Sequence, residues 1–310
     1  AAAKAAQRAA EAAAAVHEPE PCEDEQLRLK FIGVRESIVA RTKLEVDKVK
    51  PFEALIKRPY FHVKALDSAQ RHNWHRYLDF EEKTGDEGRV IRMYERCLIP
   101  CASYPEFWIR YARRAEEGDV ESARNVLRRA GGLFVKRRPE IHLYVAQFEE
   151  RHGNVEAART AFELVTTQLA PGLLEGITRH AHFERRQGGD EAACKAFDTA
   201  IEIEKAKEDS PTLSFLFLQY ARFLEEGAAG DLDAVRKVYE RAVRALPVNL
   251  SVWEAAIAFE VRQRGAGEED RVRRVLSLVE RASAPREDGD SKRSLPVEAR
   301  ALISARGVEF

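Results

Sequence analysis

The sequence contains few cysteines for its length: 310 residues include only Cys22, Cys97, Cys101 and Cys194. So few thiols cannot form the disulfide framework that stabilises small secreted domains, and a reducing compartment fits the chain better. No apolar run approaches the ~18 residues of a membrane-spanning helix. These absences favour a protein of the cytosol or the nucleus.

An excess of charge of either sign is also lacking. Lys and Arg number 51, Asp and Glu number 52, and the net charge is −1, although charged residues make up 33% of the sequence. This balance argues against bulk electrostatic binding to nucleic acid. A high charged fraction at near-zero net charge is typical of long helices whose exposed faces carry ion pairs.

Motifs of catalysis and metal binding are missing as well. The sequence has no Gly-rich phosphate loop, no nucleophile elbow and no HExxH helix. Three close pairs of ligand-type residues lack a further ligand at an accepted spacing: His72 and His75, His180 and His182, and Cys97 and Cys101. We therefore predict no catalytic residue, no cofactor and no metal, in a protein that is not an enzyme.

What the sequence does have is a repeated unit of two helical segments. In "NWHRYLDFEEKTGDEGRVIRMYERCL", the rings of Trp74, Tyr77 and Phe80 are three residues apart. Residues at this spacing share one face of a helix. The polar stretch "KTGDEG" predicts a turn. A second helical segment follows, so the unit is predicted to be a helical hairpin.

The hairpin recurs along the chain. The position of Phe80 recurs at 114, 148, 183, 223 and 259, at intervals of 34, 34, 35, 40 and 36 residues. A hairpin of this kind can bury its apolar face only by stacking on its neighbours. We therefore predict an all-α fold, an α-solenoid (superhelix) of about six hairpins. The aromatic residues expected in its core are Trp74, Tyr77, Phe80, Tyr94, Trp108, Tyr111, Phe148, Phe162, Phe183, Phe197, Tyr220, Phe223 and Tyr239.

A glutamate directly follows the aromatic residue in four hairpins. These are Glu81, Glu149, Glu184 and Glu260. A carboxylate at the edge of a buried stripe needs a cationic partner. We expect each to pair with a basic residue on the second helix, such as Arg92, Arg159, Lys195 and Arg273.

Composition divides the chain into four segments. Residues 1–26 form an Ala-rich helical or disordered lead-in, 27–69 a helical connector, 70–282 the repeat array, and 283–310 a charged linker with a C-terminal docking helix. In the connector, Tyr60 and Phe61 lie outside the repeat, and we expect them to plug the end of the array; the alternative is that they face a partner. The last helix is amphipathic, and two docking sites remain open: its own array, as a cap, or a second subunit.

One stretch is locally basic. Between Arg110 and Arg138 there are nine Lys and Arg residues against four acids. The simplest interpretation is a solvated helical face. The alternative is a contact with RNA or with an acidic partner, whose affinity would fall steeply with salt. Its residues are Arg110, Arg113, Arg114, Arg124, Arg128, Arg129, Lys136, Arg137 and Arg138.

The hairpin resembles the half-a-TPR (HAT) repeat over roughly residues 70–282. It shares the aromatic triplet and Glu on the first helix, and a "YERA"-like second helix. The run from Arg58 to Ala112, which begins "RPYFHVKALDSAQRHNWHRYLDFEE", is similar to the start of the C-terminal HAT domain of one family of pre-mRNA splicing factors. The N-terminal HAT half of that family has no counterpart here, so we expect this chain to be a C-terminal half.

The resemblance implies a non-catalytic scaffold in the nucleus. It implies a component of the small nuclear ribonucleoprotein that recognises the 5′ splice site, with other splicing-particle proteins as partners and indirect rather than direct RNA contact. Family members dimerise through their C-terminal repeats, as homodimers or with a paralogous HAT protein. A HAT scaffold of mRNA 3′-end processing is the alternative. The residues we expect at the dimer or partner interface are Trp253, Phe259, Leu302, Ile303 and Phe310.

Overall fold

The computed structural model describes residues 23–84, 86–227, 231–263, 267–284 and 295–308. These residues form helices joined by turns, and none of them lies in a strand. The chain divides into two compact units, with the boundary between Ala102 and Ser103. The predicted all-α solenoid class is confirmed by the helical hairpins of the structure.

Unit 1 contains α2 (Glu23–Ala54), α3 (Ser68–Thr84) and α4 (Glu87–Cys101). Unit 2 contains α5 (Pro105–Glu116), α6 (Val120–Arg129), η1 (Ala130–Phe134), α7 (Pro139–Arg151), α8 (Val155–Glu163), η2 (Leu164–Leu169), α9 (Leu174–Gly188), α10 (Asp190–Lys205), α11 (Leu213–Glu225), α12 (Leu232–Ala245), α13 (Leu250–Arg262), α14 (Glu268–Ser283) and α15 (Val297–Val308). The segments η1 and η2 are π-helical turns that continue α6 and α8.

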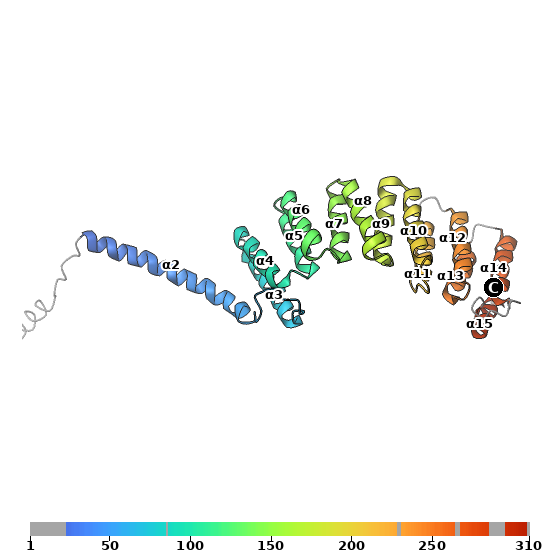
Figure 1. Ribbon diagram of the computed structural model, residues 1–310, viewed down its shortest axis with the longest axis horizontal. Coiled ribbons are helices and arrows are strands. Elements are labelled where there is room, and N and C mark those ends of the chain that lie inside the picture. The colour runs from blue at the N-terminus through green and yellow to red at the C-terminus, as the bar shows by residue number, and fades with distance from the viewer. Residues whose placement is uncertain (1–22, 85, 228–230, 264–266, 285–294, 309–310) are drawn as a thin grey trace, which may run out of the picture. The chain divides into compact units, whose positions relative to one another are not determined.

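Successive helices of unit 2 pair into hairpins, and each hairpin stacks on the next (Figure 1). The pairs are α5 with α6, α7 with α8, α9 with α10, α11 with α12, and α13 with α14. Helices α3 and α4 form the corresponding hairpin of unit 1. The described residues therefore contain the number of hairpins that the repeat interval predicts.

Local sequence fixes where many of these helices begin. Side-chain oxygens of Asp119, Asp231 and Asn249 accept hydrogen bonds from the first free backbone N–H groups of α6, α12 and α13. Pro139 occupies the first turn of α7, where its missing N–H removes no helical hydrogen bond. Between α7 and α8, Gly153 takes a φ of 78°, a left-handed conformation that glycine adopts without steric cost.

Aromatic rings form the core and join neighbouring hairpins. All the predicted core aromatic residues except Phe80 are buried, and Phe80 is half-buried. The Phe162 and Phe183 ring centroids lie 5.1 Å apart, which links α8 to α9. Phe197 and Phe223 link α10 to α11 at the same separation. Each ring therefore packs across a boundary between hairpins as well as within one.

The expectation that Tyr60 and Phe61 plug the array is wrong. Both side chains are exposed, by 58% and 55%. The end of the α3–α4 hairpin is covered instead by the last turn of α2, where the Phe52 ring stacks on Tyr77 with a centroid distance of 5.0 Å. The helix that leads into the hairpin brings Phe52 against it, so the connector rings are not needed there.

Helix α15 caps the last hairpin of its own chain. It packs against α14 (Figure 1). Ile303 and the preceding Leu295 are buried in the same apolar cluster as Val275 and Ala282 of α14. The sequence left two docking sites open for this helix. In the structure the helix docks on its own array.

Candidate interaction surfaces

A buried carboxylate–guanidinium pair joins neighbouring hairpins in unit 2. Arg124 of α6 donates to Glu149 of α7, with Nε and Nη2 at 2.8 and 3.0 Å from its two oxygens. Arg159 of α8 donates to Glu184 of α9 in the same way, at 2.7 and 3.2 Å. In both pairs the guanidinium comes from the second helix of the preceding hairpin. We call these pairs clasps.

The third clasp holds two arginines. Glu260 of α13 accepts from Arg236 of α12 at 2.8 Å and from Arg274 of α14 at 3.0 Å. The three clasp carboxylates are almost fully buried, so each needs its cation. The hydrogen bond from Arg124 holds the pKa of Glu149 below its ordinary value.

The predicted partners of these glutamates were wrong. Arg159 pairs with Glu184 of the following hairpin and not with Glu149. The other two predicted partners in unit 2 form ion pairs within their own helices: Lys195 with Glu191, and Arg273 with Asp270. In unit 1, Glu81 pairs within its hairpin, but with Arg89 instead of Arg92. In unit 2 the first-helix glutamate pairs with the hairpin before it, and Glu260 also accepts from Arg274 of its own hairpin.

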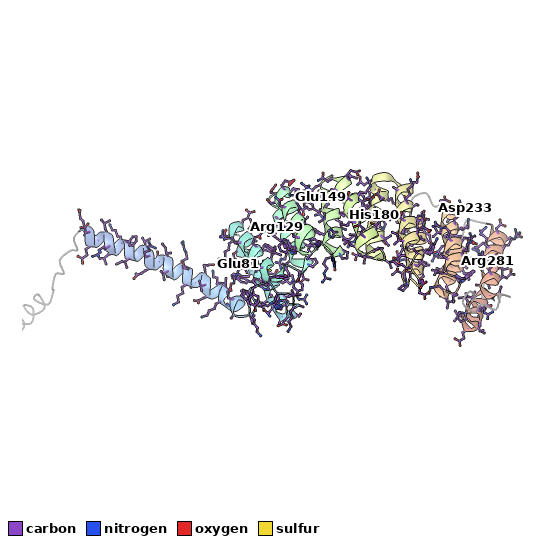
Figure 2. The ribbon with its side chains drawn as sticks, in the orientation of Figure 1. Glu81, Arg129, Glu149, His180, Asp233 and Arg281 are labelled. Atoms are coloured by element: carbon purple, nitrogen blue, oxygen red, sulfur yellow. The ribbon has the colours of Figure 1, made fainter. Side chains whose placement is uncertain are left out.

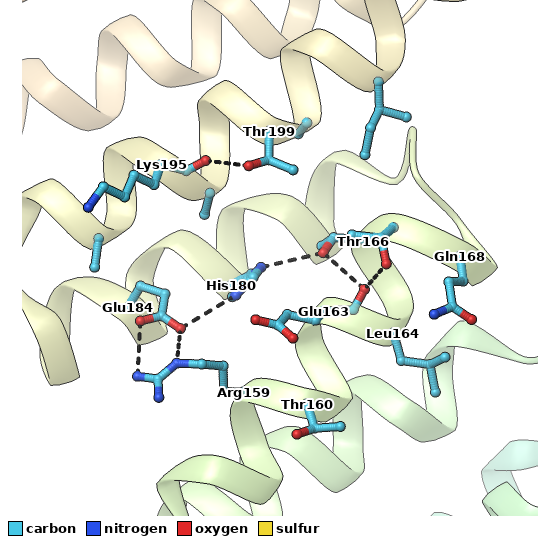
Figure 3. A pocket seen from close by; sticks show the side chains of 15 residues that line it. Arg159, Thr160, Glu163, Leu164, Thr166, Gln168, His180, Glu184, Lys195 and Thr199 are labelled. Carbon is cyan, nitrogen blue, oxygen red and sulfur yellow. Dashed lines mark hydrogen bonds and ion pairs between the residues drawn. The ribbon is translucent and has the colours of Figure 1, made fainter.

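A groove lies between α8 and α10, with α9 as its floor (Figure 3). Its volume is about 540 Å³. The floor carries the Arg159–Glu184 clasp and His180, and Figure 2 marks the place of His180 in the array. Lys195 and Thr199 of α10 stand on one wall. This groove is open to solvent along the second helices.

His180 is held in the groove floor by three contacts. Its ring stacks on Phe162 at 5.5 Å, its Nδ1 lies 3.4 Å from the Thr166 hydroxyl, and its Nε2 lies 3.6 Å from Glu184. Burial lowers the pKa of His180, against the opposing effect of Glu184. The imidazole is therefore neutral at physiological pH and serves the packing of the floor.

A second groove repeats this arrangement between α12 and α14. Its volume is about 220 Å³, and Arg236, Glu260 and Arg274 lie at its base beside Tyr239 and Phe259. Its cations are matched by acids: Arg236 also pairs with Asp233, and Arg281 pairs with Glu240. Both grooves offer polar and apolar contacts on a rigid support, which suits recognition of an extended peptide or helix.

The predicted basic segment separates into two kinds of residue. Several of its cations are engaged: Arg124 and Arg114 in ion pairs, and Arg113 and Arg129 over the rings of Tyr144 and Trp108. Arg128 donates to Asn125, and Arg110 is half-buried. The remaining three are exposed on the turn between η1 and α7: Lys136, Arg137 and Arg138.

Most of the predicted interface residues lie in the core of a single chain. Trp253, Phe259 and Ile303 are buried, and the Trp253 indole donates to the carbonyl oxygen of Pro247 at 3.0 Å. Because these three side chains are buried in the core, they present no surface to a partner. The prediction that they lie at an interface is therefore corrected. Leu302 is 46% exposed and accessible. Phe310 lies outside the described residues.

Apart from His72, which is exposed, the ligand-type residues are buried or half-buried. His182 meets the Phe223 ring edge-on at 5.1 Å, and Cys97 and Cys101 are buried. Across the described ranges, no group of three or more His, Cys, Asp or Glu side chains is placed to hold a metal ion. No helix in the part of the chain that the structure describes is long and apolar enough to span a bilayer.

Sequence reasoning missed a second set of ion pairs between hairpins. They join the ends of successive first helices: Arg151 with Glu116, Arg186 with Glu150, and Arg262 with Glu225. The partners are 35 to 37 residues apart. This separation is one repeat length, so a search for opposite charges at the repeat interval would have found them.

Comparison with known proteins finds a HAT-repeat family model and several similar pre-mRNA-processing proteins. Residues 47–186 match the family model described as the PRP39 C-terminal HAT repeat. Pre-mRNA-processing factor 39 of Xenopus laevis is 36% identical over 231 residues, which cover 74% of this chain and 35% of that protein. The human protein of the same name is 33% identical over 292 residues, covering 93% of this chain and 41% of the relative.

The Schizosaccharomyces pombe protein of that name is 34% identical over 243 residues, covering 77% of this chain and 40% of the relative. The chain thus spans well under half the length of these three relatives. The range that matches the family model contains the hairpins from α3–α4 to α7–α8 and the clasps of Glu149 and Glu184. The chain is therefore similar to part of pre-mRNA-processing factor 39 over most of its length, and residues 47–186 match the C-terminal HAT repeat model of that family.

Proposed function

We propose that this chain is a non-catalytic scaffold of pre-mRNA splicing. It would act in the nucleus as a component of the small nuclear ribonucleoprotein that recognises the 5′ splice site. The observation that carries the proposal is the similarity to pre-mRNA-processing factor 39 over as much as 93% of the chain. The grooves between second helices support it, because grooves on a stack of hairpins would offer partners a place to bind.

The scaffold would work by presenting surfaces at fixed separations. Clasps and ring pairs join each hairpin of unit 2 to its neighbour in several places. A stack tied in this way holds its grooves in register, and partners bound to different hairpins are kept at a set distance. RNA contact would be indirect, through the proteins so organised.

Self-association, with another copy or with a paralogous HAT protein, is a further part of the proposal. Exposed Leu302 on α15 supports it, since it places an apolar side chain on the outer side of the capping helix. Among the interface residues expected from the sequence, Leu302 is the described one that a second subunit can reach.

The test is purification of the tagged chain from nuclear extract, followed by identification of its protein and RNA partners. We expect proteins and the small nuclear RNA of the 5′ splice-site particle. A matched control is Phe183→Asp, which places a charge in the core and breaks the stack. Recovery of 3′-end-processing factors in place of splicing proteins would instead support the alternative HAT scaffold.

A further inference from the structure

One turn of unit 2 departs from the repeat in a way that packing does not explain. Residues 131–138, "GGLFVKRR", connect α6 to α7 through η1. Leu133 is 70% exposed and Phe134 is 50% exposed. Lys136, Arg137 and Arg138 follow directly and are also exposed. We call residues 131–138 the basic tip.

The three cations of the basic tip have no acidic partner. Within the described residues, none of Lys136, Arg137 and Arg138 forms an ion pair, although the other exposed faces of this protein are rich in them. The segment itself contains no acid. Its positive charge is therefore left uncompensated at the surface.

The backbone that carries these side chains is fixed. The N–H of Val135 donates to the Ala130 carbonyl at 2.9 Å, and the N–H of Arg138 donates to Val135 at 2.9 Å. His142 Nε2 donates to the Lys136 carbonyl at 2.9 Å. Val135 is buried. A turn held by these contacts has little backbone entropy left to lose on binding, so the cost of ordering falls on the exposed side chains.

The apolar half of the basic tip rests on the core. The Phe134 ring stacks on Trp108 with a centroid distance of 5.1 Å, and Trp108 is itself buried. Arg129, whose position is marked in Figure 2, lies over the same indole. Phe134 is thus packed on one side and exposed on the other, while Leu133 is largely exposed to solvent.

The next hairpin provides an internal comparison. Thirty-five residues further on, η2 and its turn have the same backbone hydrogen bond, from the N–H of Ala170 to the Val165 carbonyl at 2.9 Å. There Gln168 takes the place of Leu133, and Pro171, Gly172 and Leu173 take the places of the three cations. The second turn keeps an apolar residue, Leu169, in the place of Phe134, but it has neither the exposed leucine nor the three cations. The backbone turn therefore does not require Leu133 or the cations.

From this combination we infer that the basic tip binds an acidic amphipathic helix of a partner protein. Acidic side chains of such a helix would pair with Lys136, Arg137 and Arg138, and its apolar side chains would cover Leu133 and Phe134. A nucleic acid would use the cations but would leave Leu133 in water, so the exposed leucine favours protein. The inference rests on the proposed scaffold role, to which it adds one partner surface.

The test measures binding of labelled probes to the full chain by fluorescence anisotropy. The first probe is an acidic peptide of about 16 residues, with leucines at i, i+3, i+4 and i+7 and glutamates elsewhere. The second has the same composition with its leucines spread around the helix. The third is an oligouridine RNA of about 12 nucleotides. We expect the first probe to bind more tightly than the other two.

Variants assign the binding to the basic tip. Arg137→Glu/Arg138→Glu should weaken the first probe at least about tenfold, and Leu133→Ser about fivefold. The control Arg222→Glu/Lys237→Glu makes the same charge change at two exposed cations outside the basic tip and outside both grooves, and should leave affinity unchanged. Because all five side chains are exposed, circular dichroism should show the same helix content in every variant.

Three results would overturn the inference: equal binding of both peptides, tighter binding of the RNA, or unchanged binding by the Arg137→Glu/Arg138→Glu variant. Because the probes are synthetic, failure here leaves the splicing role standing. Failure of the nuclear purification, in turn, leaves the peptide measurement unaffected. The two proposals can therefore fail separately.

Discussion

Arg159 ties two hairpins together through one side chain. Its Nε and Nη2 donate to Glu184 across the boundary between α8 and α9, and its Nη1 donates to Glu156 in its own helix at 2.7 Å. The Glu184 side chain is only 9% exposed. Removing the guanidinium would therefore leave a carboxylate that is nearly buried and uncompensated.

A double-mutant cycle tests which glutamate Arg159 serves. We expect Arg159→Ala and Glu184→Ala to couple by about 1–3 kcal/mol in the free energy of unfolding, measured by urea denaturation. The control cycle pairs the same Arg159→Ala with Glu149→Ala, and the two effects should add to within about 0.5 kcal/mol. Coupling in the control cycle alone would mean that the pair forms within the hairpin after all.

His180 makes the stability of unit 2 depend on pH. Burial lowers its pKa, so below the ordinary value of 6.5 the unfolded chain takes up a proton that the folded chain resists. The stability contributed by this histidine is thus present above pH 6.5 and is lost as the pH falls toward the folded pKa. The slope cannot exceed about 1.4 kcal/mol per pH unit for one group.

We expect the urea concentration at the unfolding midpoint to decrease as the pH is lowered from about 7.5 to about 5.5, and to decrease less in His180→Gln. His182, whose pKa is also lowered, chiefly by burial, contributes to the remaining slope. His182→Gln serves as the comparison variant. A slope in His180→Gln as steep as in the parent chain would show that the buried imidazole does not titrate in this window.

Helix α15 has one face that packs against the last hairpin and another face that is exposed to solvent. Ile303 is 1% exposed and completes the core of the last hairpin, whereas its neighbour Leu302 is 46% exposed. Adjacent residues on a helix point about 100° apart, which is enough to separate a packing side chain from a surface one. This pair separates stability from association.

Substitutions at the two positions should affect different properties: stability at Ile303 and self-association at Leu302. Ile303→Ala should lower the free energy of unfolding by about 2–5 kcal/mol, whereas Leu302→Asp should change it by less than about 1 kcal/mol. If α15 carries the proposed subunit contact, Leu302→Asp should lower the mass measured by light scattering. A stable Leu302→Asp protein with unchanged mass would remove α15 from the interface.

For the whole molecule, the near-zero net charge reflects the ion pairs that its basic and acidic residues form between helices. The 51 basic and 52 acidic residues supply clasps between second and first helices, and separate ion pairs between successive first helices. A third set joins successive second helices, as Arg241 does with Asp198 and Arg281 with Glu240. Many charges are thus matched between neighbouring hairpins, whereas the three cations of the basic tip form no ion pair within the described residues.

The sequence predicted the hairpins because their signals are local. Rings spaced by three residues, such as Trp74 and Tyr77, mark one helix face, and polar turns with glycine mark its end. The candidate surfaces were harder to predict. Ile303 and Trp253 have the apolar character of interface residues, but the same character fills a core, and only the neighbouring helices show which applies.

The amino-acid sequence by itself determined the two-helix unit, its length and its aromatic core, because periodicity and turn chemistry act over a few residues. Only the tertiary structure decided which glutamate each arginine reaches, that α15 covers its own array, and which cations are left without an acid. Those outcomes depend on how one hairpin is rotated against the next. That rotation is set by the packing of whole faces, which no single stretch of sequence contains.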